Sequence, residues 1–238
     1  KEKGYQSSEV SHEIKAVEGG PKLVHVTFNM NEGPKVKIRR VEFTGNTAVS
    51  DSRLRRRMKD NRAHWWLSFL SGRGVYQETK FEEDAERVLD FYRDRGYIRA
   101  QIGDPEIRPI EDSTDKKTRW VELRVPVNEG HRYKVKSFEV AGNTVVKSDA
   151  LKPLFKLQQG QFYSQKQVRK GFQKAPEIYG AGGYMEFTGF PDYKFSDDPN
   201  PAEPQAPKML AAVDAPAPGD PMVDVTLQIQ EGKQYFIN

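Results

Sequence analysis

One short phrase recurs three times in this sequence and limits how the chain can be divided. A stretch of alternating apolar and polar residues runs each time into an acidic residue and a glycine, at 32–33, 129–130 and 231–232. The glycines are 97 residues apart (130 − 33) and then 102 apart (232 − 130). A solenoid repeat is shorter, about 20–50 residues, whereas a small domain has about this length. The sequence therefore predicts tandem small domains.

The predicted elements follow the same order in both complete units. The first has a strand at 36–43, a short helix after Ser50, an amphipathic helix at 79–95 and strands at 97–107 and 119–127. The second has a strand at 133–140, helices after Ser148 and Ser164, and strands at 184–190 and 223–230. Two helices can cover only one face of a three-stranded sheet. The predicted fold class is therefore α/β of the α+β type, in which each unit is a two-layer β-α-α-β-β domain with a mixed three-stranded sheet.

These markers divide the chain into four parts. Residues 1–33 are predicted to be the C-terminal half of a unit, and residues 34–130 and 131–232 to be complete units. A Pro-rich insertion at 191–221 interrupts the last hairpin, and residues 233–238 are predicted to begin a further unit. Two local irregularities are also expected. The apolar phase slips between Ile38 and Val41, which indicates a bulge, and Pro176 should kink or shorten its helix.

Composition and motifs give no support to catalysis. The chain has no cysteine, which excludes disulfides and thiolate chemistry. The four histidines are far apart, and none has metal-ligand spacing to another histidine or a carboxylate. No phosphate-binding loop or nucleophile motif is present. We therefore predict no enzyme activity, no catalytic residue, no cofactor and no metal. The net charge of +4 does not require a nucleic-acid partner.

Several stretches of sequence resemble a known family. The first strand of each unit reads approximately V-x-I-x-x-V-x-F-x-G-N, as at residues 36–46. The pair Trp65-Trp66, the segment 72–76 and the run DFYRDRGY at 90–97 add to the likeness. Together they resemble POTRA domains of the Omp85 family, most closely the periplasmic region of its outer-membrane protein assembly factor. On that likeness, residues 34–130 are third-like, residues 131–232 fourth-like and residues 1–33 the end of a second-like domain.

The resemblance implies a function and a location. The chain would be the periplasmic part of an outer-membrane protein, attached to its own C-terminal transmembrane β-barrel. Its implied partners are unfolded outer-membrane proteins, accessory assembly lipoproteins and periplasmic chaperones, with no nucleic acid. Two alternatives stay open: another Omp85 transporter, TamA-like or of two-partner secretion, and a nucleic-acid-binding module suggested by the basic helix. The first would have fewer domains, and the second would lose affinity steeply with salt.

The strand after the second helix is the expected client-binding edge. A sheet edge presents unpaired N–H and C=O groups, to which an extended polypeptide can add as a further strand. The candidate binding residues are Tyr97, Ile98, Arg99, Ala100, Gln101 and Ile102. A second, weaker edge comprises Tyr184, Met185, Glu186 and Phe187. The alternative is an ordinary edge that its charges and Pro105 protect.

Two further features are candidate contact sites. A possible basic and aromatic patch comprises Arg55, Arg56, Arg57, Trp65 and Trp66. It could bind lipid headgroups or an acidic partner, or it could be a solvated helix face with the aromatic residues folded back over the helices. The joints between the units comprise Asn31, Glu32, Gly33, Asn128, Glu129 and Gly130. They leave almost no linker, so limited hinging is expected.

Overall fold

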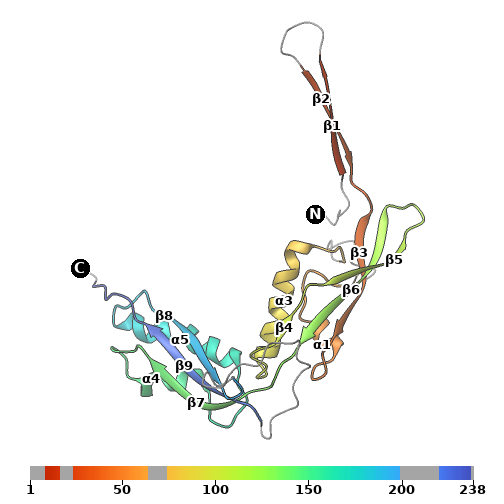
Figure 1. The fold of residues 1–238 in the computed structure, drawn as a ribbon. Helices are drawn as coiled ribbons and strands as arrows, with labels where there is room; N and C mark the ends of the chain where they lie inside the picture. Colours follow the sequence, from red (N-terminus) through yellow and green to blue (C-terminus); the bar gives the residue numbers. More distant parts are fainter. Residues whose placement is uncertain (1–8, 17–23, 64–73, 199–219, 237–238) are drawn as a thin grey trace, which may run out of the picture. The chain divides into compact units, whose positions relative to one another are not determined.

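The computed structural model describes residues 9–16, 24–63, 74–198 and 220–236 (Figure 1). Trp65, Trp66 and most of the predicted insertion lie outside these described residues. Contacts divide the chain into two compact units. The first comprises residues 1–88 and 102–128, and the second comprises residues 89–101 and 129–238.

The N-terminal hairpin carries its apolar side chains on one face. Strand β1 (Glu9–Ala16) pairs antiparallel with β2 (Val24–Asn31). Because directly paired residues share a face, the register Val10↔Met30, His12↔Phe28 and Ile14↔Val26 gathers the apolar side chains on one side. Phe28 and Met30 are each about two-thirds exposed. The two strands form a hairpin whose apolar face is open within the described residues.

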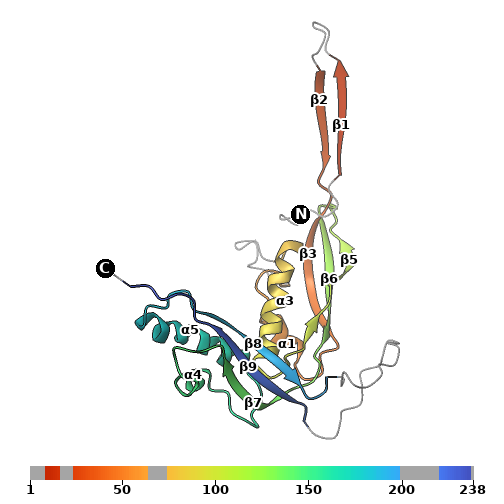
Figure 2. The ribbon, with the colours of Figure 1, turned by 60° about the vertical axis from the view of Figure 1, so that its left-hand side comes forward.

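The main sheet of the first unit is mixed. Strand β3 (Lys35–Thr44) pairs parallel with β6 (Thr118–Asn128), and β5 (Glu106–Asp112) pairs antiparallel with the other side of β6. A two-residue strand, β4 (Gln101–Ile102), joins the same sheet. Helices α1 (Asp51–Arg55) and α3 (Glu78–Arg93) complete the elements described here (Figure 2). The register of β3 shifts between Ile38 and Arg40, which confirms the expected bulge.

The second unit repeats this plan. Strand β7 (Lys134–Ala141) is parallel to the central strand β9 (Met222–Gln230), and β8 (Thr188–Phe195) is antiparallel to it. Helices α4 (Ser148–Phe155) and α5 (Gln165–Ala181) lie against the sheet and enclose the core. The register of β7 shifts between Val135 and Ser137, 97 residues after the bulge in β3. The predicted α+β fold class is confirmed.

The predicted strand at 97–107 is wrong in extent. Residues 97–100 form a turn, in which the Tyr97 N–H bonds to the Tyr92 carbonyl at 3.2 Å and the Ala100 N–H bonds to the Tyr97 carbonyl at 3.3 Å. The long strand of this hairpin is β5, which begins only at Glu106. The apolar residues Ile98 and Ala100 alternate as they would in a strand. The alternation has a different cause here, because both residues lie in a turn and their side chains pack against neighbouring residues.

The predicted strand at 184–190 is displaced in the same direction. Residues 184–187 form a turn with one isolated bridge, from Tyr184 to Gln234. Strand β8 begins at Thr188 and runs through Pro191 to Phe195, so the insertion cannot begin at Pro191. Phe187 leaves the strand pattern because its ring stacks on Tyr179, with centroids 4.5 Å apart. The expected further strand at 233–238 stays a prediction.

Helix α5 is not shortened by Pro176, because it continues to Ala181. Its packing depends instead on Gly171, which faces the fully buried ring of Phe155 on α4. A Cβ at Gly171 would lie 2.1 Å from Cδ1 of that ring. Phe155 is also held edge-on against Phe172, with centroids 5.1 Å apart. The contact between α4 and α5 therefore requires a residue without a side chain.

We predict that Gly171→Ala destabilises the second unit while Gly180→Ala, in the same helix, stabilises it. Alanine is favoured over glycine by up to about 1 kcal/mol in a helix, and at Gly180 the nearest contact of a new Cβ is 4.0 Å away. At Gly171 the clash outweighs that gain, since overpacking costs about 1–3 kcal/mol. Urea unfolding measures whether each variant raises or lowers the free energy of unfolding. Equal stabilisation by both would show that Phe155 moves aside freely.

Candidate functional site

The edge strands β5 and β8 are the exposed sheet edges that follow the second helix of each unit. Their burial patterns are mostly exposed or alternating. Both contain a proline, Pro109 in β5 and Pro191 in β8. Because proline lacks an N–H, it is tolerated in an edge strand where that N–H would face outward. Strand addition at either edge would therefore lack one donor.

The outward side of β8 can be assigned residue by residue. Positions of the same parity as Pro191 face away from β9, which places Gly189, Tyr193 and Phe195 outward. The Phe195 N–H is already bound by Oδ2 of Asp198 at 3.2 Å, which agrees with this parity. The outward donors of β8 are thus the N–H groups of Gly189 and Tyr193.

The sequence-predicted edge residues do not form a sheet edge. Arg99 lies over the Phe195 ring, 3.8 Å from its centroid, and forms ion pairs with Asp197 and Asp198. Ala100 is buried, and only Gln101 and Ile102 belong to a strand. These six residues therefore do not expose a continuous ladder of backbone groups.

The second predicted edge is equally broken up. Glu186 accepts a hydrogen bond from the Tyr235 hydroxyl at 2.6 Å. The Tyr184 N–H bonds to the Tyr179 carbonyl at 3.0 Å. Met185 is about two-thirds exposed but lies in the turn. The binding role assigned to these residues as a strand therefore has no support.

The glutamates of the second and third acidic-glycine turns are buried hydrogen-bond acceptors, whereas Glu32 in the first turn is exposed. Glu129 accepts the Tyr92 hydroxyl at 2.8 Å, and Glu231 accepts the Tyr179 hydroxyl at 2.9 Å. Both carboxylates are more than nine-tenths buried. The glycines that follow have positive φ, 61° at Gly130 and 72° at the last turn. At 129–130 and 231–232 the phrase therefore marks a contact between the end of the last strand and the second helix.

Glu231 also holds the loop after the first strand of its unit. Its Oε2 accepts the N–H of Thr144 at 3.0 Å and the Thr144 hydroxyl, and its Oε1 accepts the N–H of Val145 at 3.0 Å. Gly142, which begins this loop, has φ of 79°, and a Cβ there would lie 2.3 Å from the Ile229 carbonyl oxygen. The loop that begins at Gly142-Asn143 is therefore in contact with the glutamate of the last acidic-glycine turn.

Burial raises the pKa of Glu231, but the hydrogen bonds from Thr144, Val145 and Tyr179 outweigh it, and the net pKa is lowered from 4.5. Burial and the same carboxylate raise the pKa of Tyr179. A lowered carboxylate pKa contributes stability that is present above the unfolded-state pKa. That stability is lost as the pH falls through the folded-state pKa.

We predict that Glu231→Gln costs about 2–3 kcal/mol at neutral pH, because the amide NH₂ would face donors in place of an acceptor. The difference from the natural chain should narrow as the pH falls from about 6 to about 3, since the natural carboxylate then becomes protonated. Chemical unfolding across this range measures both effects. Glu177→Gln, on the exposed face of α5, is the matched control. If the difference in unfolding free energy between Glu231→Gln and the natural chain stays constant with pH, the carboxylate does not act through its charge.

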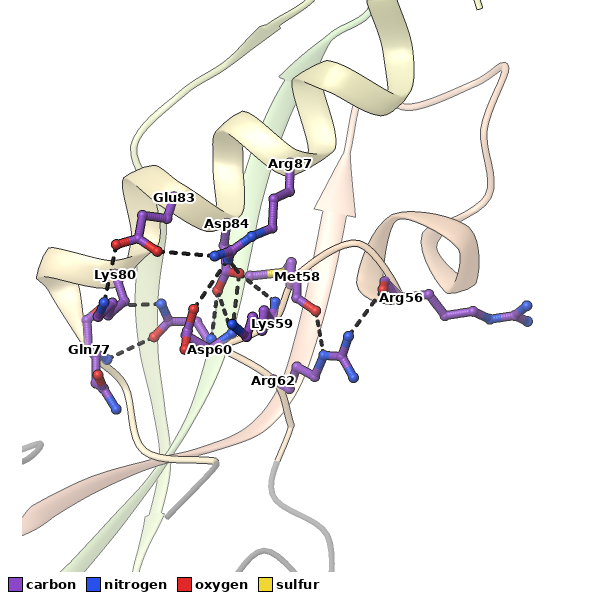
Figure 3. Close-up of polar contacts among 11 residues, drawn as sticks. Arg56, Met58, Lys59, Asp60, Arg62, Gln77, Lys80, Glu83, Asp84 and Arg87 are labelled. Carbon is purple, nitrogen blue, oxygen red and sulfur yellow. Dashed lines mark hydrogen bonds and ion pairs between the residues drawn. The ribbon is translucent and has the colours of Figure 1, made fainter. Parts of the chain in front are cut away.

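A second buried carboxylate, Asp84, organises the segment after α1 (Figure 3). Its oxygens accept the N–H groups of Lys59, Asp60 and Asn61, the last at 2.7 Å. Arg87 donates to the same carboxylate at 2.7 Å. This places one negative charge against three successive backbone donors and a guanidinium.

Asn61 links the segment after α1 to Gln77, the residue that precedes α3. Its Nδ2 donates to the Gln77 carbonyl at 3.0 Å, and its Oδ1 accepts the Gln77 N–H at 2.8 Å. Asn61 is fully buried. The two chain segments on either side of 64–73 are therefore joined by a closed pair of hydrogen bonds.

The predicted basic patch is only partly a free surface. Nη1 of Arg55 binds the Val41 carbonyl at 3.0 Å. Arg56 and Arg57 are exposed, and Arg62 donates to the carbonyls of Met58 and Arg56. The aromatic half of the predicted patch lies outside the described residues. Arg55 therefore caps a backbone carbonyl of β3 as well as contributing positive charge to the surface.

We predict that Asp84→Asn costs about 3–5 kcal/mol, the usual cost of breaking a buried charged pair. The amide would leave Arg87 without its buried partner and would point an NH₂ group at backbone donors. Urea unfolding gives the free energy, and hydrogen exchange at the Asn61 amide should accelerate. Glu83→Gln is the control, because Glu83 pairs with the same Arg87 but is half-exposed and should cost less than about 1 kcal/mol. Equal costs for the two variants would contradict the buried role of Asp84.

Sequence reasoning missed Tyr92, Tyr179 and Asp84 as polar anchors. Both tyrosines lie within amphipathic helices that the sequence predicts, at 79–95 and after Ser164. Their signal was the recurrence of tyrosine near the end of the second helix in both units, before each acidic-glycine turn. Asp84 had no such signal, because the equivalent position in the second unit is Gly171.

Among the described residues, no group of three or more histidine and acidic side chains could hold a metal ion. None of the described helices is long and apolar enough to cross a membrane. What the two units present instead is polar backbone at sheet edges and buried carboxylates that hold the elements together.

Comparison with known proteins agrees with this architecture. Outer membrane protein assembly factor BamA of Neisseria meningitidis serogroup B is 28% identical over 216 residues, which cover 90% of this chain and 24% of that protein. BamA of Buchnera aphidicola is 24% identical over 162 residues, which cover 68% of this chain and 25% of that protein. The chain thus spans about a quarter of the length of these relatives.

The fold is also found among solved structures. The crystal structure of Haemophilus influenzae BamA POTRA3-5 superposes with a TM-score of 0.59 at 22% identity, and the match covers 84% of this chain and 67% of that one. The family model described as POTRA, surface antigen variable number repeat, matches residues 36–130 and 133–232. Since these matches take in most of the sequence, the chain belongs to the POTRA family.

Proposed function

We propose that this chain is the polypeptide-binding and scaffolding region of a BamA-like assembly factor for outer-membrane β-barrel proteins. POTRA domains are the periplasmic part of BamA-like outer-membrane proteins. In this proposal the chain captures unfolded outer-membrane proteins by strand addition and docks accessory lipoproteins. It works by binding and positioning, with no catalytic step. Periplasmic chaperones would deliver the clients.

One observation supports capture by strand addition above all others. Each unit ends its mixed sheet in an exposed antiparallel strand, β5 in the first unit and β8 in the second. Main-chain hydrogen bonds depend little on the sequence of the added strand. An edge of this kind therefore suits a receptor for many different clients.

We also propose the domain boundaries that the repeat predicts. Residues 34–130 and 131–232 each complete a domain, and residues 1–33 supply the last hairpin of a preceding one. The open apolar face of β1 and β2 supports this, since the sheets of both later units are covered by helices. Its partner would be the helices of that same domain.

The test is a titration of the isotopically labelled chain with a peptide from a strand of an outer-membrane protein, followed by backbone NMR. We expect the amide signals of Gly189 and Tyr193 in β8 to shift, together with those of β5. The same peptide with alternate backbone amides N-methylated cannot add as a strand, and it should bind about tenfold more weakly or worse. Equal binding by both peptides would overturn strand addition, and the absence of binding by either would overturn client capture.

A further inference from the structure

Each unit has a groove beside the outer edge of its first strand. In the second unit it lies between β7 and the C-terminal part of α4, with a volume of about 840 Å³. In the first unit it lies between β3 and the residues around α1, with a volume of about 320 Å³. Lining positions correspond at the 97-residue spacing, including Val41 with Phe138, Arg55 with Lys152 and Asn61 with Gln158. The two grooves are the same feature at two places in the repeat.

The start of both strand edges is covered by backbone. The Ile38 N–H bonds to the Gly74 carbonyl at 2.8 Å, and the Val135 N–H bonds to the Gln161 carbonyl at 2.9 Å. Beyond this point each strand has its bulge, and the outward-facing groups continue into the groove. What closes the rest of the edge therefore decides whether a further strand can add there.

In the first unit, two side chains of α1 close the edge of β3. Nη1 of Arg55 donates to the outward carbonyl of Val41 at 3.0 Å. Oδ2 of Asp51 accepts the outward N–H of Phe43 at 3.2 Å. Together they satisfy the groups that a neighbouring strand would otherwise pair.

In the second unit, the equivalent side chains are Ser148 and Lys152, and both are engaged elsewhere. The Ser148 hydroxyl lies 3.1 Å from Nδ2 of Asn143, and Nζ of Lys152 lies 3.3 Å from Glu139. By the 97-residue correspondence, the outward groups are the carbonyl of Phe138 and the N–H of Val140. Within the described part of the chain, no side chain or loop bonds to either group. This stretch of β7 is an open edge.

The other edges of the two mixed sheets each have outward groups that are missing or already paired. The outward side of β8 lacks a donor at Pro191, and Asp198 binds another. Strand β5 contains Pro109, and β3 is closed as described above. Such features weaken strand pairing at single positions without closing the whole edge. Their lack along this part of β7 leaves an edge that is available to a partner.

The groove beside this edge is positively charged and has an apolar base. Its lining includes Lys136, Lys152 and Lys156 against the single carboxylate of Glu139, with Phe138 from the strand. Lys136 pairs with Asp224 at 3.4 Å, and Lys152 pairs with Glu139 at 3.3 Å. Lys156 is exposed, and no carboxylate of the described residues pairs with it. A segment that fits here is extended, apolar on one side and acidic on the other.

We propose that the groove between β7 and α4 binds an extended acidic polypeptide segment, which adds as a strand to β7 at Phe138 and Val140. The lysines then pair with its carboxylates, and Phe138 contacts its apolar side chains. This inference rests on the proposed function and gives it a specific site and a preferred chemistry. The first unit has the corresponding groove, but there Asp51 and Arg55 already pair with the edge of β3.

The test exchanges the closing side chains between the units. The chain is labelled for NMR and titrated with a synthetic peptide that alternates valine and aspartate. The amide signals of residues 138–140 should shift, and a peptide with lysine in place of aspartate should bind about tenfold more weakly or worse. The double variant Ser148→Asp/Lys152→Arg should lose these shifts, because its side chains would close β7 as Asp51 and Arg55 close β3.

The control and the reverse exchange sharpen this result. Lys174→Arg, on α5 away from the β7 edge, changes lysine to arginine without touching the edge and should bind as the natural chain does. The variant Asp51→Ser/Arg55→Lys should gain peptide-dependent shifts at the amides of 41–43. Thermal unfolding of each variant verifies that it is folded.

The outcomes separate this inference from the broader proposal. If the acidic peptide shifts only β5 or β8, client capture stands and the β7 site is overturned. A double variant that binds as tightly as the natural chain also overturns strand addition at β7. If neither peptide shifts any sheet edge, the β7 site and the proposed function fall together.

Discussion

A buried glutamate directly after the last strand joins three separate elements of the second unit. In the second unit, Glu231 accepts hydrogen bonds from α5 and from the loop after β7, and it follows directly on β9. One side chain thus ties together the first strand's loop, the second helix and the last strand, which are far apart in the sequence. A charged group at this depth is costly unless its hydrogen bonds are complete, so the three elements have to assemble together. The acidic-glycine phrase at 231–232 is the part of the sequence that supplies this buried acceptor.

Much of the fold could be predicted because it depends on periodicity and glycine placement. The bulge in β3, the long second helices and the parallel outer strands all left regular signals. The edge strands did not. Tyr97–Ala100 alternates apolar and polar residues as a strand would, but the turn bonds that follow Gly96 take precedence over that alternation. Residues 184–187 differ for a similar reason, because Phe187 is drawn onto Tyr179.

Strand addition could be predicted from the sequence as a mode of binding, but the β7 edge that we propose for it could not. Sequence reasoning expected strand addition at the strand after the second helix, and it had no means of comparing the outer edge of the first strand between units. That comparison needs the hydrogen bonds of Arg55 and Asp51, which are tertiary. The difference between arginine and lysine at equivalent positions carries the information, because a planar guanidinium with five donors can cap a carbonyl while it also packs. In the sequence the two appear as a conservative exchange.

The two units also hold their helices together in chemically different ways, and this affects how neighbouring copies avoid one another. Asp84 needs the three backbone donors of 59–61, while at the same position of the second unit Gly171 needs the ring of Phe155. If the helices of adjacent repeats were exchanged during folding, Phe155 would meet a carboxylate, and Asp84 would lose its donors in a buried place. Tandem domains of one fold are prone to such misassembly. The divergence between Asp84 and Gly171 therefore gives each domain a means of recognising its own parts.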